Sequence, residues 1–150
     1  MKKIKFEIII GASKEVVWDK LITLETYKIW TMPFNPSSSY EGDLEKVGSR
    51  VKFLGADENG EEGGMLSEIA ECRKNEYLSI KHIGMIKKGV EDTESEAVKK
   101  WSPAFENYTL SSHDGMTKFE VDIDCNEEWE SYFNETWPKA LLVLKEICEA

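Results

Sequence analysis

The chain has 150 residues, which is enough for one domain whose hydrophobic core needs no disulfide or metal to hold it. Its formal net charge of −10 at pH 7 would repel phosphate backbones and anionic lipid surfaces, so nucleic-acid binding and membrane insertion are not expected. The three cysteines are odd in number and far apart, which argues against a disulfide framework and favours a reducing cytoplasm as the setting.

The first part of the chain predicts one strand and two helices. Apolar residues alternate with charged ones over residues 4–10, which is typical of a half-buried strand. Ser13 is the expected N-cap of a helix that starts at Lys14, because apolar residues recur there at helical spacing. A second, shorter helix should hold Tyr27 and Trp30, until the prolines that follow break it.

The middle of the chain predicts a meander of antiparallel strands. Asn59-Gly60 and Asp114-Gly115 are typical of the tight turns that join hairpin strands. Gly63-Gly64 indicates either a β-bulge or a close approach of two backbones. The expected strands are residues 38–43, 50–55, 64–73, 76–84, 106–111 and 117–124.

The segment 85–102 has a mixed composition and two alternative interpretations. Residues 93–100 could form a short helix. Otherwise the whole segment is a loop long enough to suggest a function, and it would act as a lid or as a strut.

The closing segment 127–149 predicts one long helix, since large apolar residues recur in it every three or four positions. Pro138 lies inside this segment and should kink the helix, because proline has no backbone N–H to donate. In the alternative, residues 127–134 form a separate turn and the helix proper begins at Trp137, with Pro138 at its first position.

This order of elements resembles the helix-grip fold of the START-like (SRPBCC) superfamily. The stretches that carry the resemblance are Ala12–Leu21, Trp30–Phe34, Tyr40–Asp43, Gly48–Phe53 and Trp137–Lys145. Within the superfamily, the chain is similar to the branch related to the C-terminal domain of the activator of the heat-shock-90 chaperone's ATPase. The resemblance implies a single α+β domain over residues 1–150, with a curved antiparallel sheet wrapped around a long C-terminal helix.

The resemblance also implies a cavity between the sheet and the closing helix. Members of the superfamily bind lipids, sterols, hormones or polyketides there, and some cyclise polyketides. Such sites are mostly apolar with a few polar groups. The candidate ligand-binding residues are Phe53, Met65, Ile80, His82, Trp101, Glu106, Tyr108, Phe133, Trp137 and Leu141. Phe133 and Trp137 are either ligand contacts or core residues, and Trp101 either plugs the cavity mouth or anchors the loop.

His82 and Glu106 are the polar candidates whose placement matters most. An inward histidine on an apolar strand face is more often a hydrogen-bonded structural residue than a catalyst. Glu106 has the strand parity of Tyr108 and would face the cavity with it. The alternative, which the strand prediction favours, leaves Glu106 in water at the first residue of its strand. If the two residues meet, they form the only acid–base pair within reach of the cavity.

The leading hypothesis is therefore binding of a small, largely apolar molecule in the cavity. No catalytic, metal or cofactor-binding motif is present, so catalysis is not the leading expectation and no cofactor is expected. One alternative is a chaperone-related protein-interaction module with a protein partner, which predicts a filled core and an exposed apolar patch. The other is an enzyme of the polyketide-cyclase type, in which His82 or Glu106 would move protons.

Overall fold

Eight strands form one antiparallel sheet, in the chain order predicted from the sequence apart from one additional short strand. The computed structural model describes residues 1–150. The strands are β1 (Lys2–Ile10), β2 (Ser39–Glu41), β3 (Arg50–Ala56), β4 (Glu62–Arg73), β5 (Tyr77–Lys87), β6 (Val90–Asp92), β7 (Ala104–His113) and β8 (Met116–Cys125). Neighbouring strands in the sheet follow the order β1-β8-β7-β5-β4-β3-β2, and β6 pairs with β5.

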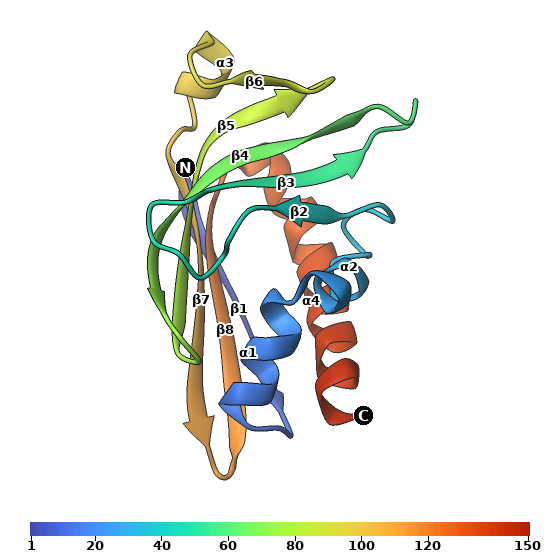
Figure 1. Cartoon of the computed structure of the whole chain (residues 1–150), viewed down its shortest axis with the longest axis vertical. Coiled ribbons are helices and arrows are strands. Elements are labelled where there is room, and N and C mark those ends of the chain that lie inside the picture. The colour runs from blue at the N-terminus through green and yellow to red at the C-terminus, as the bar shows by residue number, and fades with distance from the viewer.

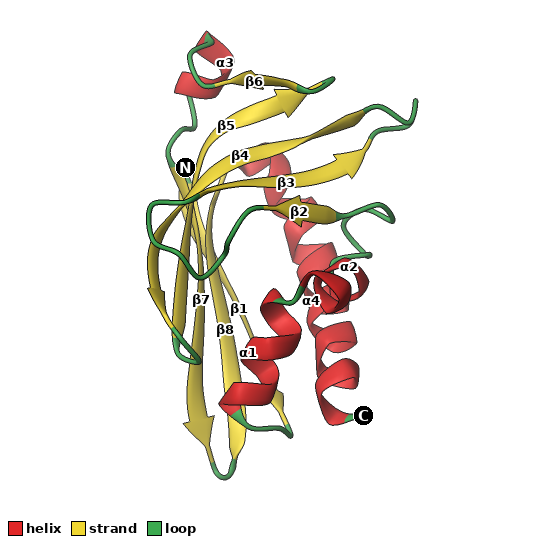
Figure 2. Cartoon of the chain, in the orientation of Figure 1, coloured by secondary structure: helices red, strands yellow, loops and turns green.

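Three of the four helices lie within the curve of this sheet. The helices are α1 (Lys14–Ile22), α2 (Leu24–Trp30), α3 (Glu96–Lys99) and α4 (Glu127–Glu149). Figure 1 shows α4 running along the inner face of the sheet with α1 and α2 beside it, while α3 lies apart, next to β6. Figure 2 shows the resulting α+β architecture, a curved sheet on one side and helices on the other, and the predicted helix-grip fold is confirmed. None of the helices combines the length and the apolar character that a membrane span requires.

Helix α4 runs unbroken from Glu127 to Glu149, so the alternative with a separate turn before Trp137 is wrong. Pro138 cannot donate to the carbonyl four residues before it. The helix continues through this position because its inner face is buried on both sides of the proline, at Trp137 and Leu141 among others. Tertiary packing therefore outweighs the lost hydrogen bond.

The segment between β5 and β7 contains the short strand β6, which pairs with β5, and the short helix α3. β5 extends beyond the predicted end to Lys87 and returns as β6, which sequence analysis did not predict. The predicted helix shortens to the four residues of α3, whose N-cap Ser95 accepts from the Val98 backbone N–H at 3.2 Å. Val98 is 1% exposed, so a buried side chain attaches α3 to the rest of the domain.

The core of the domain fills the space between α1, the C-terminal half of α4 and the sheet. Trp18 and Trp30 are both almost fully buried. Their indole N–H groups donate to the Glu45 side chain at 3.1 Å and to the Leu21 carbonyl at 3.0 Å. The three cysteines are unpaired, and burial raises the pKa of the Cys148 thiol to about 11.

Gly64 lies where two backbones approach closely, which is one of the two alternatives predicted from Gly63-Gly64. Its φ of +155° is a conformation that other residues rarely adopt. A Cβ atom at this position would lie 1.7 Å from the Phe53 carbonyl oxygen on β3. The bulges of the β4–β5 ladder lie elsewhere, between Leu66 and Ser67 and between Ile69 and Glu71.

We expect Gly64→Ala to lower the free energy of unfolding by about 3 kcal/mol or more, because the added methyl group has no space. Gly60→Ala is the matched control, since Gly60 also has a positive φ but no atom lies within 4 Å of the place that its Cβ would take. Gly60→Ala should lower the free energy of unfolding by about 1 kcal/mol, which is the penalty for the positive φ alone. Urea denaturation of the two variants measures both values, and equal losses would show that the close approach at Gly64 does not matter.

Candidate functional site

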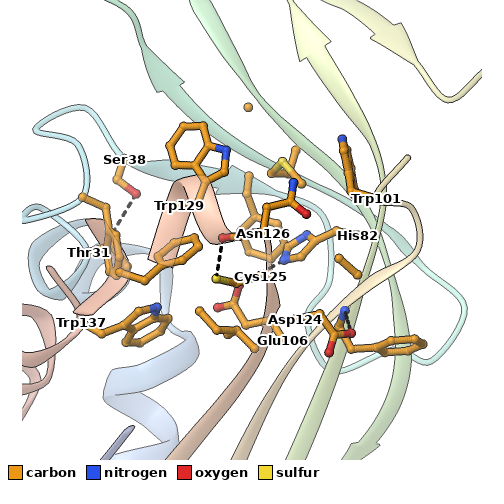
Figure 3. A pocket seen from close by; sticks show the side chains of 18 of the residues that line it. Thr31, Ser38, His82, Trp101, Glu106, Asp124, Cys125, Asn126, Trp129 and Trp137 are labelled. Carbon is orange, nitrogen blue, oxygen red and sulfur yellow. Dashed lines mark hydrogen bonds and ion pairs between the residues drawn. The ribbon is translucent and has the colours of Figure 1, made fainter. Parts of the chain in front are cut away.

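A cavity of about 440 Å³ lies between the N-terminal half of α4 and the inner face of the sheet. It is lined by 23 residues, of which 16 are hydrophobic. Figure 3 shows Trp129 and Trp137 of α4 on one part of the wall, and His82 and Glu106 of the sheet on another. Met1 and Trp129 are the most exposed members of the wall, at 59% and 51%, so they mark the mouth.

The cavity lies where β5 separates from β7. β5 pairs with β7 from Tyr77 to His82, and beyond that point β6 takes the place of β7 along its edge. The Ser102 hydroxyl donates to the Ile83 carbonyl at 3.1 Å, which satisfies the backbone where the two strands separate. Trp101, one residue earlier, is half-buried and contributes to the wall.

Aromatic side chains make up much of the wall. They are Tyr27, Trp30, Phe34, Phe53, Trp101, Phe105, Tyr108, Trp129, Phe133 and Trp137. Helical spacing explains why three of them come from α4, since residues four apart lie on one face of a helix. Many of the rings pack edge-to-face against each other, and the Trp137 and Phe34 ring centroids are 5.0 Å apart. Such contacts hold the rings in fixed orientations around the empty space.

Four polar side chains form a hydrogen-bonded series on the sheet side of the cavity, which we call the polar network. Its members, in order, are Ser67, His82, Glu106 and Tyr108. The Ser67 hydroxyl lies 2.6 Å from His82 Nδ1, and His82 Nε2 lies 3.0 Å from Glu106 Oε1. The Tyr108 hydroxyl donates to the other carboxylate oxygen, Oε2.

The sheet register accounts for the polar network. At the β4–β5 bulge, Leu66 pairs with Gly84 but Ser67 pairs with His82, so one residue of β5 is left without a partner. The bulge thereby places Ser67 directly opposite His82. On the other side of β5, His82 pairs with Ala104, and Glu106 follows two residues later on the same face of β7.

The polar network has a defined set of donors. A carboxylate only accepts hydrogen bonds, so Nε2 of His82 donates to Glu106, while Nδ1 of the same ring faces the Ser67 hydroxyl. Burial, followed by the charge of Glu106, raises the pKa of Tyr108 well above its ordinary value. The same two causes raise the pKa of Tyr27. Both phenols therefore keep their protons at neutral pH and can donate.

Glu106 lies in the cavity wall, and the interpretation that placed it in water is wrong. β7 begins two residues earlier than predicted, at Ala104, so Glu106 is inside the strand and not at its frayed end. Its side chain is 21% exposed and that of His82 is 12% exposed. The two residues therefore meet, the case that the sequence left conditional, within the hydrogen-bond distance given above.

The other sequence candidates divide between the cavity and the core. The candidates that line the cavity are Phe53, Met65, His82, Trp101, Glu106, Tyr108, Phe133 and Trp137. Ile80 and Leu141 do not line it, and they are 1% and 3% exposed within the main core. Ile80 lies further along β5 in the part that pairs with β7, and Leu141 lies one helical turn beyond Trp137, where α4 packs closely.

Most of the wall contributed by α2 and the loop after it was not among the residues predicted from the sequence. Tyr27, Trp30 and Phe34 line the cavity, but no periodic signal places α2 beside α4 before the fold is known. Trp129 was also missed, although it lies four residues before Phe133 on the same helix face and periodicity alone could have identified it. No group of three or more histidine, cysteine or acidic residues is arranged to hold a metal ion.

Trp137 belongs to both the core and the cavity wall, and its role in stability can be measured against that of Trp129. Trp137 is 3% exposed, and we expect Trp137→Ala to lower the free energy of unfolding by about 3–5 kcal/mol. Trp129 is 51% exposed at the mouth, so Trp129→Ala should change the free energy of unfolding by no more than about 0.5 kcal/mol. Denaturant unfolding followed by circular dichroism gives both values, and a small loss for Trp137→Ala would contradict its place in the core.

No family model and no curated protein matches the chain. The Aha1 dimer from Colwellia psychrerythraea, solved in solution, matches it in structure with a TM-score of 0.71 and 21% identity, over 99% of this chain and 97% of that one. A protein from Nitrosomonas europaea gives a TM-score of 0.73 at 17% identity, over 97% of this chain and 92% of that one. A protein from Mesorhizobium loti gives 0.72 at 14% identity, over 97% and 96%. At these identities the likeness establishes the START-like fold predicted from the sequence, and no activity.

Proposed function

We propose that the chain binds a small, largely apolar molecule in the cavity between the sheet and α4. The observation that carries this proposal is the cavity itself, whose volume of about 440 Å³ and predominantly hydrophobic wall are typical of small-molecule sites. The wall also contains a few polar groups, among them His82, Glu106 and Tyr108 of the polar network, which would fix the orientation of a ligand. The unpaired cysteines support a reducing compartment, such as the cytoplasm, as the place of binding.

The cavity supports ligand binding over the protein-interaction alternative, which predicted a filled core. A cavity with hydrophobic walls loses dispersion contacts and is therefore costly to maintain in a folded protein. The wall residues are mutually packed aromatic rings, so they do not simply collapse into the space. An occupant would recover the lost contacts, and its binding would stabilise the folded state.

Native mass spectrometry of the freshly purified chain is the first test. We expect an excess mass that disappears on denaturation, because an apolar ligand in a largely buried site dissociates slowly. The released molecule can then be identified by its own mass. If the spectrum shows only the bare chain, the titration described next decides whether the cavity binds a ligand, because it does not depend on a molecule carried through purification.

Titration with 1-octanol tests the site directly and should be saturable. Four of the five tryptophans line the cavity, so intrinsic fluorescence should change as it fills. Met65→Trp places a larger side chain in the cavity and should weaken octanol binding at least about tenfold, as measured by calorimetry. Met116→Trp is the matched control, because Met116 is 40% exposed and lies outside the cavity.

The outcomes of these two experiments decide the proposal. Unchanged binding in Met65→Trp would place the ligand elsewhere on the molecule. A bare chain in the mass spectrum, together with no saturable binding of octanol, would overturn the proposal altogether.

A further inference from the structure

The cavity wall carries two carboxylates but no lysine or arginine. No lysine or arginine is among its 23 residues, whereas two of them, Glu106 and Asp124, are acidic. Asp124 is already paired, since its Oδ1 lies 3.2 Å from Lys3 Nζ and its Oδ2 accepts from the Phe105 backbone N–H at 2.9 Å. Glu106 has no such cation, and its only ionic partner is His82.

Glu106 also has unused capacity to accept hydrogen bonds. Each of its carboxylate oxygens accepts one bond inside the protein, from His82 and from Tyr108. A carboxylate has about four acceptor sites, so about two remain, and the side chain lines the cavity. These sites are open to an occupant that carries a hydrogen-bond donor.

Several aromatic rings lie in the same wall as this carboxylate. The Tyr108 ring centroid lies 6.3 Å from that of Trp137, and the Phe53 centroid lies 5.9 Å from the His82 ring. Tyr27 continues the arrangement, 6.1 Å from Phe53. The faces of such rings carry partial negative charge and attract cations that approach within about 6 Å of the centroid.

We infer that the ligand of this cavity is an organic cation, an apolar body that carries one protonated amine, with the amine beside Glu106 and the body against the aromatic wall. This inference rests on the proposed function and specifies the chemical class of its ligand. The amine donates hydrogen bonds to the free acceptor sites of Glu106. The negative carboxylate and the partial negative charge of the ring faces both stabilise the positive charge of the amine.

The same environment selects against the opposite charge. An anionic head group would lie next to Glu106 in a partly buried site, where like charges repel more strongly than in water. The wall has no lysine or arginine that could compensate it, and its histidine, His82, is already paired with Glu106. The net charge of −10 acts in the same direction at longer range, since it attracts cations and repels anions before they reach the mouth.

Three probes with the same chain length separate charge from apolar burial: n-octylammonium, 1-octanol and octanoate, each kept below its self-association concentration at pH 7 and low salt. The amine and the alcohol both donate a hydrogen bond, so they differ chiefly in charge. By calorimetry, we expect n-octylammonium to bind at least about tenfold more tightly than 1-octanol, and octanoate to bind most weakly.

Glu106→Gln should remove the preference for the cation. It keeps the size of the side chain but not its charge, so the affinity for n-octylammonium should fall about tenfold while that for 1-octanol changes less than about twofold. Glu71→Gln is the matched control, because Glu71 is 51% exposed on β4 and outside the cavity. If Glu106→Gln does not fold, the ranking of the three probes on the unmodified chain decides the inference.

The failures of the two proposals are distinguishable. Equal binding of amine and alcohol, or tightest binding of octanoate, would overturn the cation and leave the ligand-binding function standing. Retention of the cation preference in Glu106→Gln would also overturn it. Saturable binding of none of the three probes, together with a bare chain in the mass spectrum, would overturn both.

Discussion

The packing of α4 against the curved sheet is the constraint on which the rest of this structure depends. Along its C-terminal half, Leu144 and Cys148 are buried directly against the core. Along its N-terminal half, Trp129, Phe133 and Trp137 point into the space between helix and sheet. Large flat rings that pack against each other keep the backbone of α4 at a distance from the strands, and the remaining space is the cavity. One helix thus closes the core with one half and encloses a binding space with the other.

The polar network shows how buried polar groups are accommodated in such a wall. No buried side-chain nitrogen or oxygen in the molecule lacks a hydrogen-bond partner. Ser67, which is 0% exposed, orients His82, and His82 and Tyr108 together orient Glu106. A satisfied network of this kind is rigid, because moving any member would leave another buried group unpaired. The carboxylate is therefore held in one orientation before any ligand arrives.

Much of the fold could be predicted from the sequence because its signals are local. The bounds of α4 follow from its apolar spacing, and the Asp114-Gly115 turn follows from the conformational preferences of those two residues, which both have a positive φ. The position of Glu106 could not be decided in this way, because it depends on where β7 begins, and strand ends are set by pairing with β5 and β8. Ile80 and Leu141 have the parity and spacing of the wall residues, but the cavity ends before it reaches them. Periodicity identifies the inward face of an element, and only the packed structure shows how far along that face the empty space extends.

β1 is the long outer strand of the sheet, and one of its edges has no neighbouring strand. Unpaired edges of this kind can recruit a strand from another molecule. Here α4 covers the far end of β1, where Lys145 Nζ donates to the Ile9 carbonyl at 3.2 Å and Glu149 accepts from the Gly11 backbone N–H at 2.7 Å. At the other end, Lys2 Nζ lies 2.8 Å from Glu130 of the same helix. The helix that encloses the cavity therefore also protects this edge of the sheet against edge-to-edge aggregation. A strand from a second molecule would have to displace these contacts before it could pair along the whole of β1.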